Sequence, residues 1–260
     1  MEYKTIICEE HGKVVVVKLN LPESLNAISK DLTEDLDNVL NALEKDAKVA
    51  ALVITGAGRA FCAGANLNEI LHLEGVTAFY NMLKKVQLVI NRVADYSKPV
   101  VAAVNGPALG GGLELCTACD ICVASDNSVF GLPEINVGVL PGAGGMTRLS
   151  RMVGPHRARQ LVMTGDKISA GQAKEMGLVW QVAPPEKLQA TALELAARLA
   201  EKPPLAIQAA KRVINSSGFI DLTTAMDYEA GSVAMLFGTR DCREGLQAFV
   251  EKRQPKYKGK

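Results

Sequence analysis

The sequence predicts an α/β fold, because segments typical of strands and of amphipathic helices alternate through its first two thirds. Its composition agrees with a folded globular protein, since 48% of the residues are apolar and 22% are charged. A chain of 260 residues can bury a sizeable core. No segment has the composition of a domain linker or of a low-complexity region, so we expect one large domain with an appended element.

The first elements follow from runs of β-branched residues and from helical periodicity. A buried strand is expected over residues 13–20, KVVVVKLN, because this run is β-branched and too short for a typical helix. An amphipathic helix is expected over residues 29–46, where apolar residues recur at helical spacing. These residues are Leu32, Leu36, Val39, Leu40 and Leu43. The run ALVITG predicts the next strand at residues 51–56.

The alternation continues after the loop AGRAFCAGAN, which is rich in Gly and Ala. A helix is expected at about residues 76–94, and a strand over residues 98–106 with a proline near its start, where a missing N–H does least harm. The segments ICVAS and LVWQVAP have the composition of further strands. This order of elements favours an α/β architecture over one with segregated helices and strands.

The last part of the chain contains only helical patterns. Helices are expected at residues 185–201, 204–215, about 221–237, and 239–252. Prolines at positions 184, 185, 203 and 204 fit the first turns of two of them. We therefore expect a helical C-terminal element that packs on the core or on another subunit.

Charge and targeting signals exclude several classes of partner. The net charge of +1 gives no reason to expect binding to nucleic acid or to an anionic membrane, because only the C-terminal segment KRQPKYKGK is locally basic. The N-terminal segment lacks the pattern of a secretory signal, and no apolar run reaches membrane-spanning length. The sequence therefore predicts a cytoplasmic protein with reduced thiols.

Three cysteines offer a possible metal or iron–sulfur site. Cys116, Cys119 and Cys122 follow the spacing C-x-x-C-x-x-C, but no fourth cysteine lies at a usual distance. They fall where a helix ends and a strand follows, so their side chains need not converge, and buried core residues are the favoured interpretation. His11, His72 and His156 form no zinc motif, and no metal is expected.

The glycine run NGPALGGGLEL has the composition of a tight strand-to-helix turn. Free N–H groups in the first turn of the new helix, with the helix dipole behind them, would suit a developing oxyanion. A glycine-rich turn without a ligand explains this stretch alone equally well. A dinucleotide-binding turn is less favoured, because the glycines do not form G-x-G-x-x-G after the first strand.

Two glutamates stand in apolar surroundings. Glu114 lies one turn into the expected helix, among Leu113, Leu115 and Cys116, and Glu134 follows a proline before a second glycine-rich turn. Burial would raise both pKa values toward neutral pH and fit the carboxyl groups for proton transfer. Spacing alone does not bring them together, and a surface or capping role is the alternative for each.

Three segments together carry a resemblance to a known family. They are, in order, GRAFCAGANLNEI, NGPALGGGLELCTACDICVAS and FGLPEINVGVLPGAGGMTRL. In motif, order and spacing the chain closely resembles the enoyl-CoA hydratase/isomerase (crotonase) superfamily over essentially its whole length. The resemblance implies an α/β crotonase-like spiral of repeated ββα units over residues 1–197. A C-terminal helical oligomerisation region would follow over residues 198–260 and build a homotrimer or a homohexamer.

The resemblance also implies a site and a reaction. Backbone N–H groups of Ala65 and Gly111 would hold the oxygen of a thioester enolate, and Glu114 and Glu134 would hold the water that adds to a 2-enoyl-CoA. Ala63 and the segment Ala65, Asn66, Leu67 and Asn68 would line the path of the coenzyme A part of the substrate. No separate cofactor is expected, because coenzyme A belongs to the substrate.

Several alternatives remain within and outside this family. The same scaffold can isomerise a double bond or hydrate an alicyclic dienoyl-CoA, and some relatives bind RNA. Asn66 stands where the family often has an acid, which would change loop hydrogen bonding or substrate preference. The tail residues Lys252, Arg253 and Lys256 are expected either to reach a nucleotide of their own or a neighbouring subunit, or to be solvated.

Overall fold

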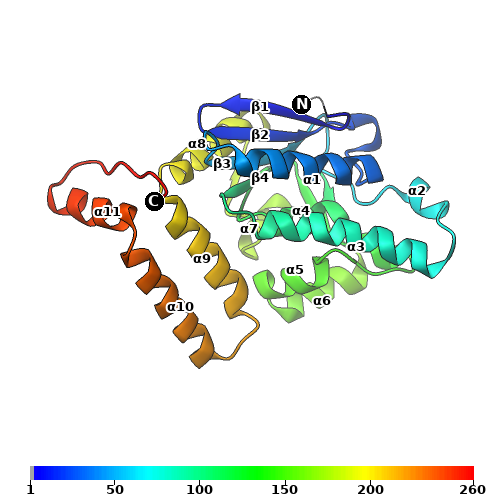
Figure 1. Ribbon diagram of the computed structural model, residues 1–260. Coiled ribbons are helices and arrows are strands. Elements are labelled where there is room, and N and C mark those ends of the chain that lie inside the picture. The colour runs from blue at the N-terminus through cyan, green and yellow to red at the C-terminus, as the bar shows by residue number, and fades with distance from the viewer. Residues whose placement is uncertain (1–2) are drawn as a thin grey trace.

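A computed structural model describes residues 3–260 and is built around a six-stranded sheet (Figure 1). Its strand order is β1-β2-β3-β4-β6-β9, with β1 antiparallel to β2 and the later pairs parallel. The strands are β1 (Ile6–His11), β2 (Val14–Leu19), β3 (Ala51–Gly56), β4 (Val100–Val104), β6 (Ile121–Ser125) and β9 (Gln181–Ala183). The predicted α/β alternation is therefore confirmed.

The β-branched runs are strands because both of their faces are buried. In β2, Val15 and Val17 belong to the core cluster that includes side chains of α1 (Lys30–Lys45) and α3 (Gly75–Ala94), whereas Val14 and Val16 pack against α8 (Pro185–Ala200). Successive side chains of a strand point to opposite faces, and a sheet covered on both sides reads as a continuous apolar run. Helices accordingly flank the sheet on both sides in Figure 1.

The predicted ends of the early elements agree closely with the structure. Helix α1 begins after Ser29, whose Oγ accepts a hydrogen bond from Leu32 N at 3.1 Å as an N-cap. Strand β4 is shorter than the expected residues 98–106 and ends at Val104. The reason is that the next residue, Asn105, uses its side chain to accept the Gly56 N–H at 3.1 Å.

A second, small sheet lies beside the first and has the order β5-β7-β8. Its strands are β5 (Ala108–Leu109), β7 (Val129–Gly131) and β8 (Lys167–Ser169). The other helices that precede β9 are α2 (Leu67–Leu71), α4 (Gly111–Ala118), α5 (Gly145–Val153), α6 (Pro155–Thr164) and α7 (Ala170–Glu175), with 3-10 turns η1 (Pro22–Ser24) and η2 (Pro133–Val137). Strands of two or three residues show no periodicity, so the sequence did not predict this sheet.

The last three helices extend away from the sheet (Figure 1). They are α9 (Pro204–Ser217), α10 (Leu222–Phe237) and α11 (Arg240–Val250), close to the ranges expected for them. Residue 198, where the C-terminal region was expected to begin, lies within α8, whose side chains still pack on the sheet. The division of the chain at that residue stays a prediction.

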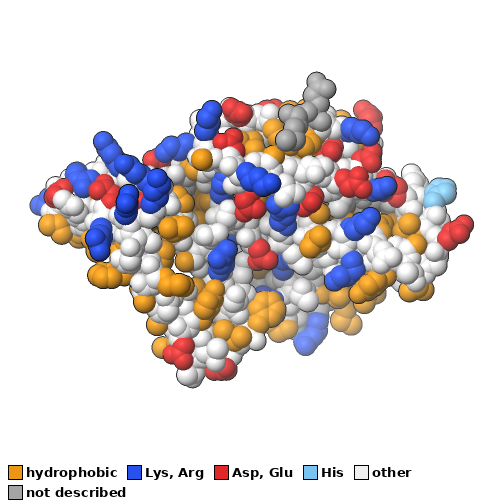
Figure 2. Space-filling model, viewed as in Figure 1, with side chains coloured by type: hydrophobic (Ala, Val, Ile, Leu, Met, Phe, Trp, Pro, Cys, Tyr) orange, Lys and Arg blue, Asp and Glu red, His pale blue; other side chains and the backbone are white. Residues whose placement is uncertain are grey.

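The C-terminal helices bury few residues within the chain. No residue of α9 is buried, and in α10 only Ala225 and Ser232 are. Apolar side chains gather along the outer edge of α10 and α11 (Figure 2). The exposed apolar residues of these two helices include Leu222, Met226, Val233, Met235, Phe237, Leu246, Phe249 and Val250. No helix within residues 3–260 is long and apolar enough to cross a membrane.

The cysteine triplet is part of the core. Cys116, Cys119 and Cys122 are all buried, which confirms the favoured interpretation. Two of the side chains do converge, since the Cys116 Sγ and Cys122 Sγ atoms lie 3.4 Å apart. They meet because α4 turns directly into β6. Across the described part of the chain, no group of three or more His, Cys, Asp or Glu side chains could hold a metal ion.

Candidate active site

Backbone hydrogen bonds join the loop after β3 to the strand before α4. Cys62 N–H donates to the Pro107 carbonyl at 3.1 Å, and Leu109 N–H donates to the Cys62 carbonyl at 3.0 Å. On its other side the loop pairs with Ile28, whose N–H donates to the Gly64 carbonyl at 2.7 Å. The loop is therefore fixed between two segments that are distant in the sequence.

This pairing brings the backbones of Ala65 and Gly111 together. In the bridge to Ile28 the bonds are made by the Gly64 carbonyl and the Asn66 N–H, so the N–H of Ala65 points to the opposite side. Gly111 is the first residue of α4, where N–H groups have no acceptor within the helix. A methyl group on Gly111 would lie 3.8 Å from Ala65 N, which puts both donors at one place.

Two glycines make this close approach possible. A Cβ atom on Gly112 would lie 2.0 Å from the Cys62 carbonyl oxygen, so no larger residue fits between α4 and the loop. Gly110 has φ +52° and ψ −124°, a backbone conformation that L side chains rarely adopt. The GGG run is therefore required by the geometry of the turn.

Two asparagines that the sequence analysis did not single out shape the same loop. The buried Asn26 donates to the carbonyls of Ala57 and Ala60 at 2.9 and 2.8 Å, and Asn105 donates to the Gly58 carbonyl at 3.0 Å. Asn26 has φ +57°, which fits its place in the turn after the first parallel strand. In the sequence, the only indication of this role for Asn26 is the turn-forming composition of the segment LPESLNA.

Glu114 projects from the first turn of α4 and is 4% exposed. Its Oε1 accepts N–H bonds from Ala143 at 2.6 Å and from Gly145 at 2.8 Å, both in the glycine-rich loop before α5. Burial raises the pKa of Glu114, while the two N–H donors and the positive charge of Arg148 act in the opposite direction. Glu114 is thus a fixed and buried carboxyl group.

Glu134 reaches the same place from η2, three residues after β7. The Gly110 N–H donates to the Gly131 carbonyl at 2.9 Å, so the end of β7 lies beside the start of α4. A Cβ on Gly110 would lie 2.9 Å from Glu134 Oε1. The other oxygen, Oε2, is buried and has no hydrogen-bond partner within residues 3–260. Burial, with a smaller contribution from the charge of Glu114, raises the pKa of Glu134 to about 7.

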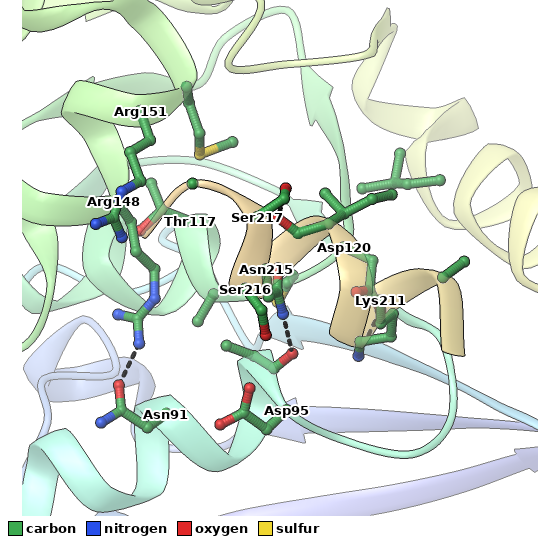
Figure 3. Close-up of a pocket in the computed structure, with 18 of the residues that line it drawn as sticks. Asn91, Asp95, Thr117, Asp120, Arg148, Arg151, Lys211, Asn215, Ser216 and Ser217 are labelled. Carbon is green, nitrogen blue, oxygen red and sulfur yellow. Dashed lines mark hydrogen bonds and ion pairs between the residues drawn. The ribbon is translucent and has the colours of Figure 1, made fainter. Parts of the chain in front are cut away.

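Ala65, Gly111, Glu114 and Glu134 open into one cavity of about 1100 Å³. Ala63, Ala65, Asn66, Leu67 and Asn68, the residues expected to line the coenzyme A path, line this cavity together with Gly111, Glu114 and Glu134. Its apolar wall includes Phe79, Met82, Leu83, Val86, Val137, Val139 and Leu140. A second cavity, of about 1110 Å³, is lined by the ends of α3 and α4 and by α5 and α9, and it contains neither glutamate (Figure 3).

The side chain of Asn66 is the N-cap of α2. Its Oδ1 caps this helix by accepting bonds from Asn68 N at 3.2 Å and Glu69 N at 3.4 Å. Of the basic tail, Arg253 pairs with Glu244 and Glu251, both at 2.6 Å. None of Lys252, Arg253 and Lys256 is among the residues that line the cavity of this chain.

The fold and the site define an enzyme in which two backbone N–H donors and two carboxyl groups, one buried and one half-buried, share a cavity. The family model for enoyl-CoA hydratase/isomerase matches residues 9–260. The short-chain-enoyl-CoA hydratase of Clostridium acetobutylicum is 40% identical over 257 residues, 98% of this chain and 97% of that protein. The crotonyl-CoA hydratase of Syntrophomonas wolfei is 39% identical over 260 residues, 99% of each chain.

Solved structures agree with the sequence comparison. An enoyl-CoA hydratase from Bacillus anthracis superposes with a TM-score of 0.94 at 39% identity, over 99% of this chain and 100% of that one. The chain belongs to the enoyl-CoA hydratase/isomerase family, and the expected crotonase-like fold is confirmed.

Proposed function

We propose that the protein is an enoyl-CoA hydratase that adds water reversibly, in the syn sense, across the double bond of a 2-enoyl-CoA. The observation that carries this proposal is the pair of glutamates, Glu114 and Glu134, that open into one cavity beside two backbone N–H donors. The names of the relatives support it, since both describe hydratases of 2-enoyl-CoA thioesters.

The N–H groups of Ala65 and Gly111 would hold the thioester oxygen. As water adds to the β carbon, negative charge moves onto this oxygen and an enolate-like state forms. Donors fixed by the backbone stabilise that state more than the uncharged substrate, which lowers the barrier. The dipole of α4 acts in the same direction, because Gly111 is its first residue.

The different surroundings of the two glutamates support a division of roles. Burial raises the pKa of Glu114, but the two N–H donors and the charge of Arg148 oppose that rise and fix its Oε1 in place, so we assign to Glu114 the proton of the attacking water. The pKa of Glu134 is raised to about 7, so it is suited to give a proton to the α carbon. The bond from the water oxygen to the β carbon forms as Glu114 takes the proton of the water, Glu134 then protonates the α carbon, and proton exchange with solvent restores both groups.

Double-bond isomerisation is the main alternative within the family, because it also uses a held enolate. Mass spectrometry separates the two reactions when crotonyl-CoA and, in a parallel sample, a 3-enoyl-CoA are incubated with the enzyme in H₂¹⁸O. Hydration incorporates labelled oxygen into a 3-hydroxyacyl-CoA product. An isomerase would convert a 3-enoyl-CoA to its 2-enoyl isomer without taking up the label, and that result with no hydration would overturn the proposal.

We further propose a short, straight acyl chain as the substrate. The acyl group would lie near Glu114 and Glu134 against the apolar wall contributed by α3 and by residues 137–140. The substrates named for the two relatives, short-chain and crotonyl, support this choice. Comparison of kcat/KM for straight-chain and alicyclic dienoyl-CoA thioesters tests it, and a preference for the cyclic substrate would contradict it.

We propose that α9, α10 and α11 assemble a homotrimer or a homohexamer. Their sparse burial within the chain and the apolar side chains along α10 and α11 support an interface, since a patch of this kind is uncommon on a monomer. Light scattering after size exclusion should give three or six times the mass of one chain. The absence of a disulfide among the cysteines of residues 3–260, four of which are buried, supports the predicted cytoplasmic location.

A further inference from the structure

The loop that fixes Glu114 is itself held by a side chain outside the substrate cavity. Arg148, in α5, donates from Nη1 to the Ala143 carbonyl at 2.9 Å. The N–H of this same Ala143 donates to Glu114 Oε1 at 2.6 Å. One residue of the loop therefore connects the guanidinium group directly to the carboxyl group.

The guanidinium group also fills the space over the next residue of the loop. Gly144 has φ +108°, and a Cβ atom there would lie 1.9 Å from Arg148 Nη1. The Arg148 N–H donates to the Gly144 carbonyl at 2.8 Å and starts the first turn of α5. Both the side chain and the backbone of Arg148 thus fix the loop whose N–H groups at Ala143 and Gly145 point at Glu114.

A second contact ties Arg148 to α3. Its Nη2 donates to Asn91 Oδ1, and Figure 3 shows this bond reaching across the edge of the second cavity. Arg148 lines that cavity and not the one that contains the two glutamates. Its position is therefore determined by α3 and α5, and substrate bound beside Glu114 would not touch it.

The positive charge of Arg148 is available to Glu114. No carboxylate within residues 3–260 forms an ion pair with Arg148. Burial lowers the pKa of Arg148, and Glu114 is the strongest of the charged groups that oppose this effect. Asp95, Arg151 and Cys119 also act on the pKa of Arg148. The titratable groups that face Glu114 are Arg148, the Glu134 carboxyl and the Cys62 thiol.

We propose that Arg148 is a positioning residue for hydration, which sets the orientation and the charge of Glu114 through the loop at residues 143–145. This inference rests on the proposed function of Glu114 as the base. It assigns a role to a side chain that lies outside the cavity in which we place the substrate. Arg151, one turn later in α5, has no such role, because its guanidinium group stacks on the Phe219 ring, 3.3 Å from the ring centroid.

The test compares Arg148→Met and Arg148→Lys with the control Arg151→Met, which removes the same charge one turn later in α5. In Arg148→Met we expect kcat for crotonyl-CoA to fall on the order of 100-fold, because small displacements of a catalytic group have effects of that size. KM should stay within about 2-fold, since Arg148 lies outside the substrate cavity. Arg151→Met should keep the wild-type kcat.

The pH profile separates positioning from a general loss of structure. Without the positive charge the pKa of Glu114 rises, so the acidic limb of kcat/KM should move to higher pH in Arg148→Met. In Arg148→Lys the limb should stay near the wild-type pH, while kcat is still about 10-fold reduced, because a lysine lacks the planar fork. Wild-type kcat and an unmoved limb in Arg148→Met would overturn the proposal.

Two further measurements keep the test decisive. If Arg148→Met does not fold, Arg148→Lys and Asn91→Ala carry the test, and Asn91→Ala should lower kcat by about 3- to 10-fold because it removes only the bond to α3. Wild-type kcat in both would overturn the proposal. The wild-type protein is assayed first. If it hydrated no enoyl-CoA, that result would overturn the proposed function rather than the role of Arg148.

Discussion

Gly112 allows α4 and the loop after β3 to approach closely enough for both N–H donors to reach one oxygen. Its replacement by alanine tests that geometry directly. The new Cβ atom would lie 2.0 Å from the Cys62 carbonyl oxygen and 2.8 Å from its carbon. Ordinary contact begins at 3.4 Å, so α4 and the loop must separate by about 1.4 Å. The Cys62 carbonyl cannot rotate away, because it accepts the Leu109 N–H at 3.0 Å.

The displacement acts directly on the distance between the two N–H donors. Ala65 follows Cys62 in the loop and Gly111 precedes Gly112 in α4, so a movement of either segment removes one donor from the thioester oxygen. Loss of one such donor lowers kcat by roughly 100- to 1000-fold. We therefore expect Gly112→Ala to lower the rate of crotonyl-CoA hydration by about that factor.

The matched control is Gly171→Ala, in α7, where the nearest atom to the new Cβ is Ser169 Oγ at 3.8 Å. This variant should keep the wild-type kcat, and its melting temperature should be equal to or above that of the wild type because alanine favours a helix over glycine. Circular dichroism shows whether Gly112→Ala is folded, and the loss of enoyl-thioester absorbance gives the rate. If a folded Gly112→Ala protein had the wild-type kcat, the contact between Gly112 and the Cys62 carbonyl would not determine the distance between the two N–H donors.

Three further outcomes follow from the glutamates. Glu114→Gln and Glu134→Gln should each lower kcat for hydration by about 100- to 10,000-fold, measured with crotonyl-CoA, and a wild-type rate in either would remove that residue from the mechanism. The kcat/KM of the wild type should fall as the pH rises through about 7, because Glu134 of the free enzyme then loses its proton. An alkaline limb well above that pH would contradict the role of Glu134 as the proton donor. Because its folded-state pKa is raised, Glu134 stabilises the fold at low pH, and this contribution is lost as the pH rises through about 7. At about pH 8 the Glu134→Gln variant should therefore be roughly 1 kcal/mol more stable than wild type, allowing for the partial exposure of the side chain, and thermal melts should show this difference vanish near pH 4.

The fold was predictable where a local pattern reports burial. The valines of residues 14–17 are buried on both faces of the sheet, and such a run has no other stable place in a folded chain. The β5-β7-β8 sheet was not predictable, because it depends on contacts such as Ala108 with Phe130 that two or three residues cannot encode locally. Yet this sheet carries Glu134 to the start of α4.

The residues of the site were predictable from the sequence, whereas most of the groups that hold them in place were not. The positions of Ala65, Gly111, Glu114 and Glu134 came from the motifs, and the structure brings all four to one cavity. The groups that fix them are long-range partners without a motif of their own. Arg148 is one example, since its bonds reach a loop carbonyl and α3, and single-sequence patterns carry no record of such contacts.

We propose that Glu114 and Glu134 catalyse the hydration of a 2-enoyl-CoA held by two backbone N–H groups. The most direct measurement is the loss of the conjugated enoyl-thioester absorbance of crotonyl-CoA with wild-type protein and with folded Glu114→Gln. We expect rapid loss with the wild type and a loss slowed by at least about 100-fold in the variant. Equal rates in the two proteins, or no loss with folded wild-type protein, would contradict it.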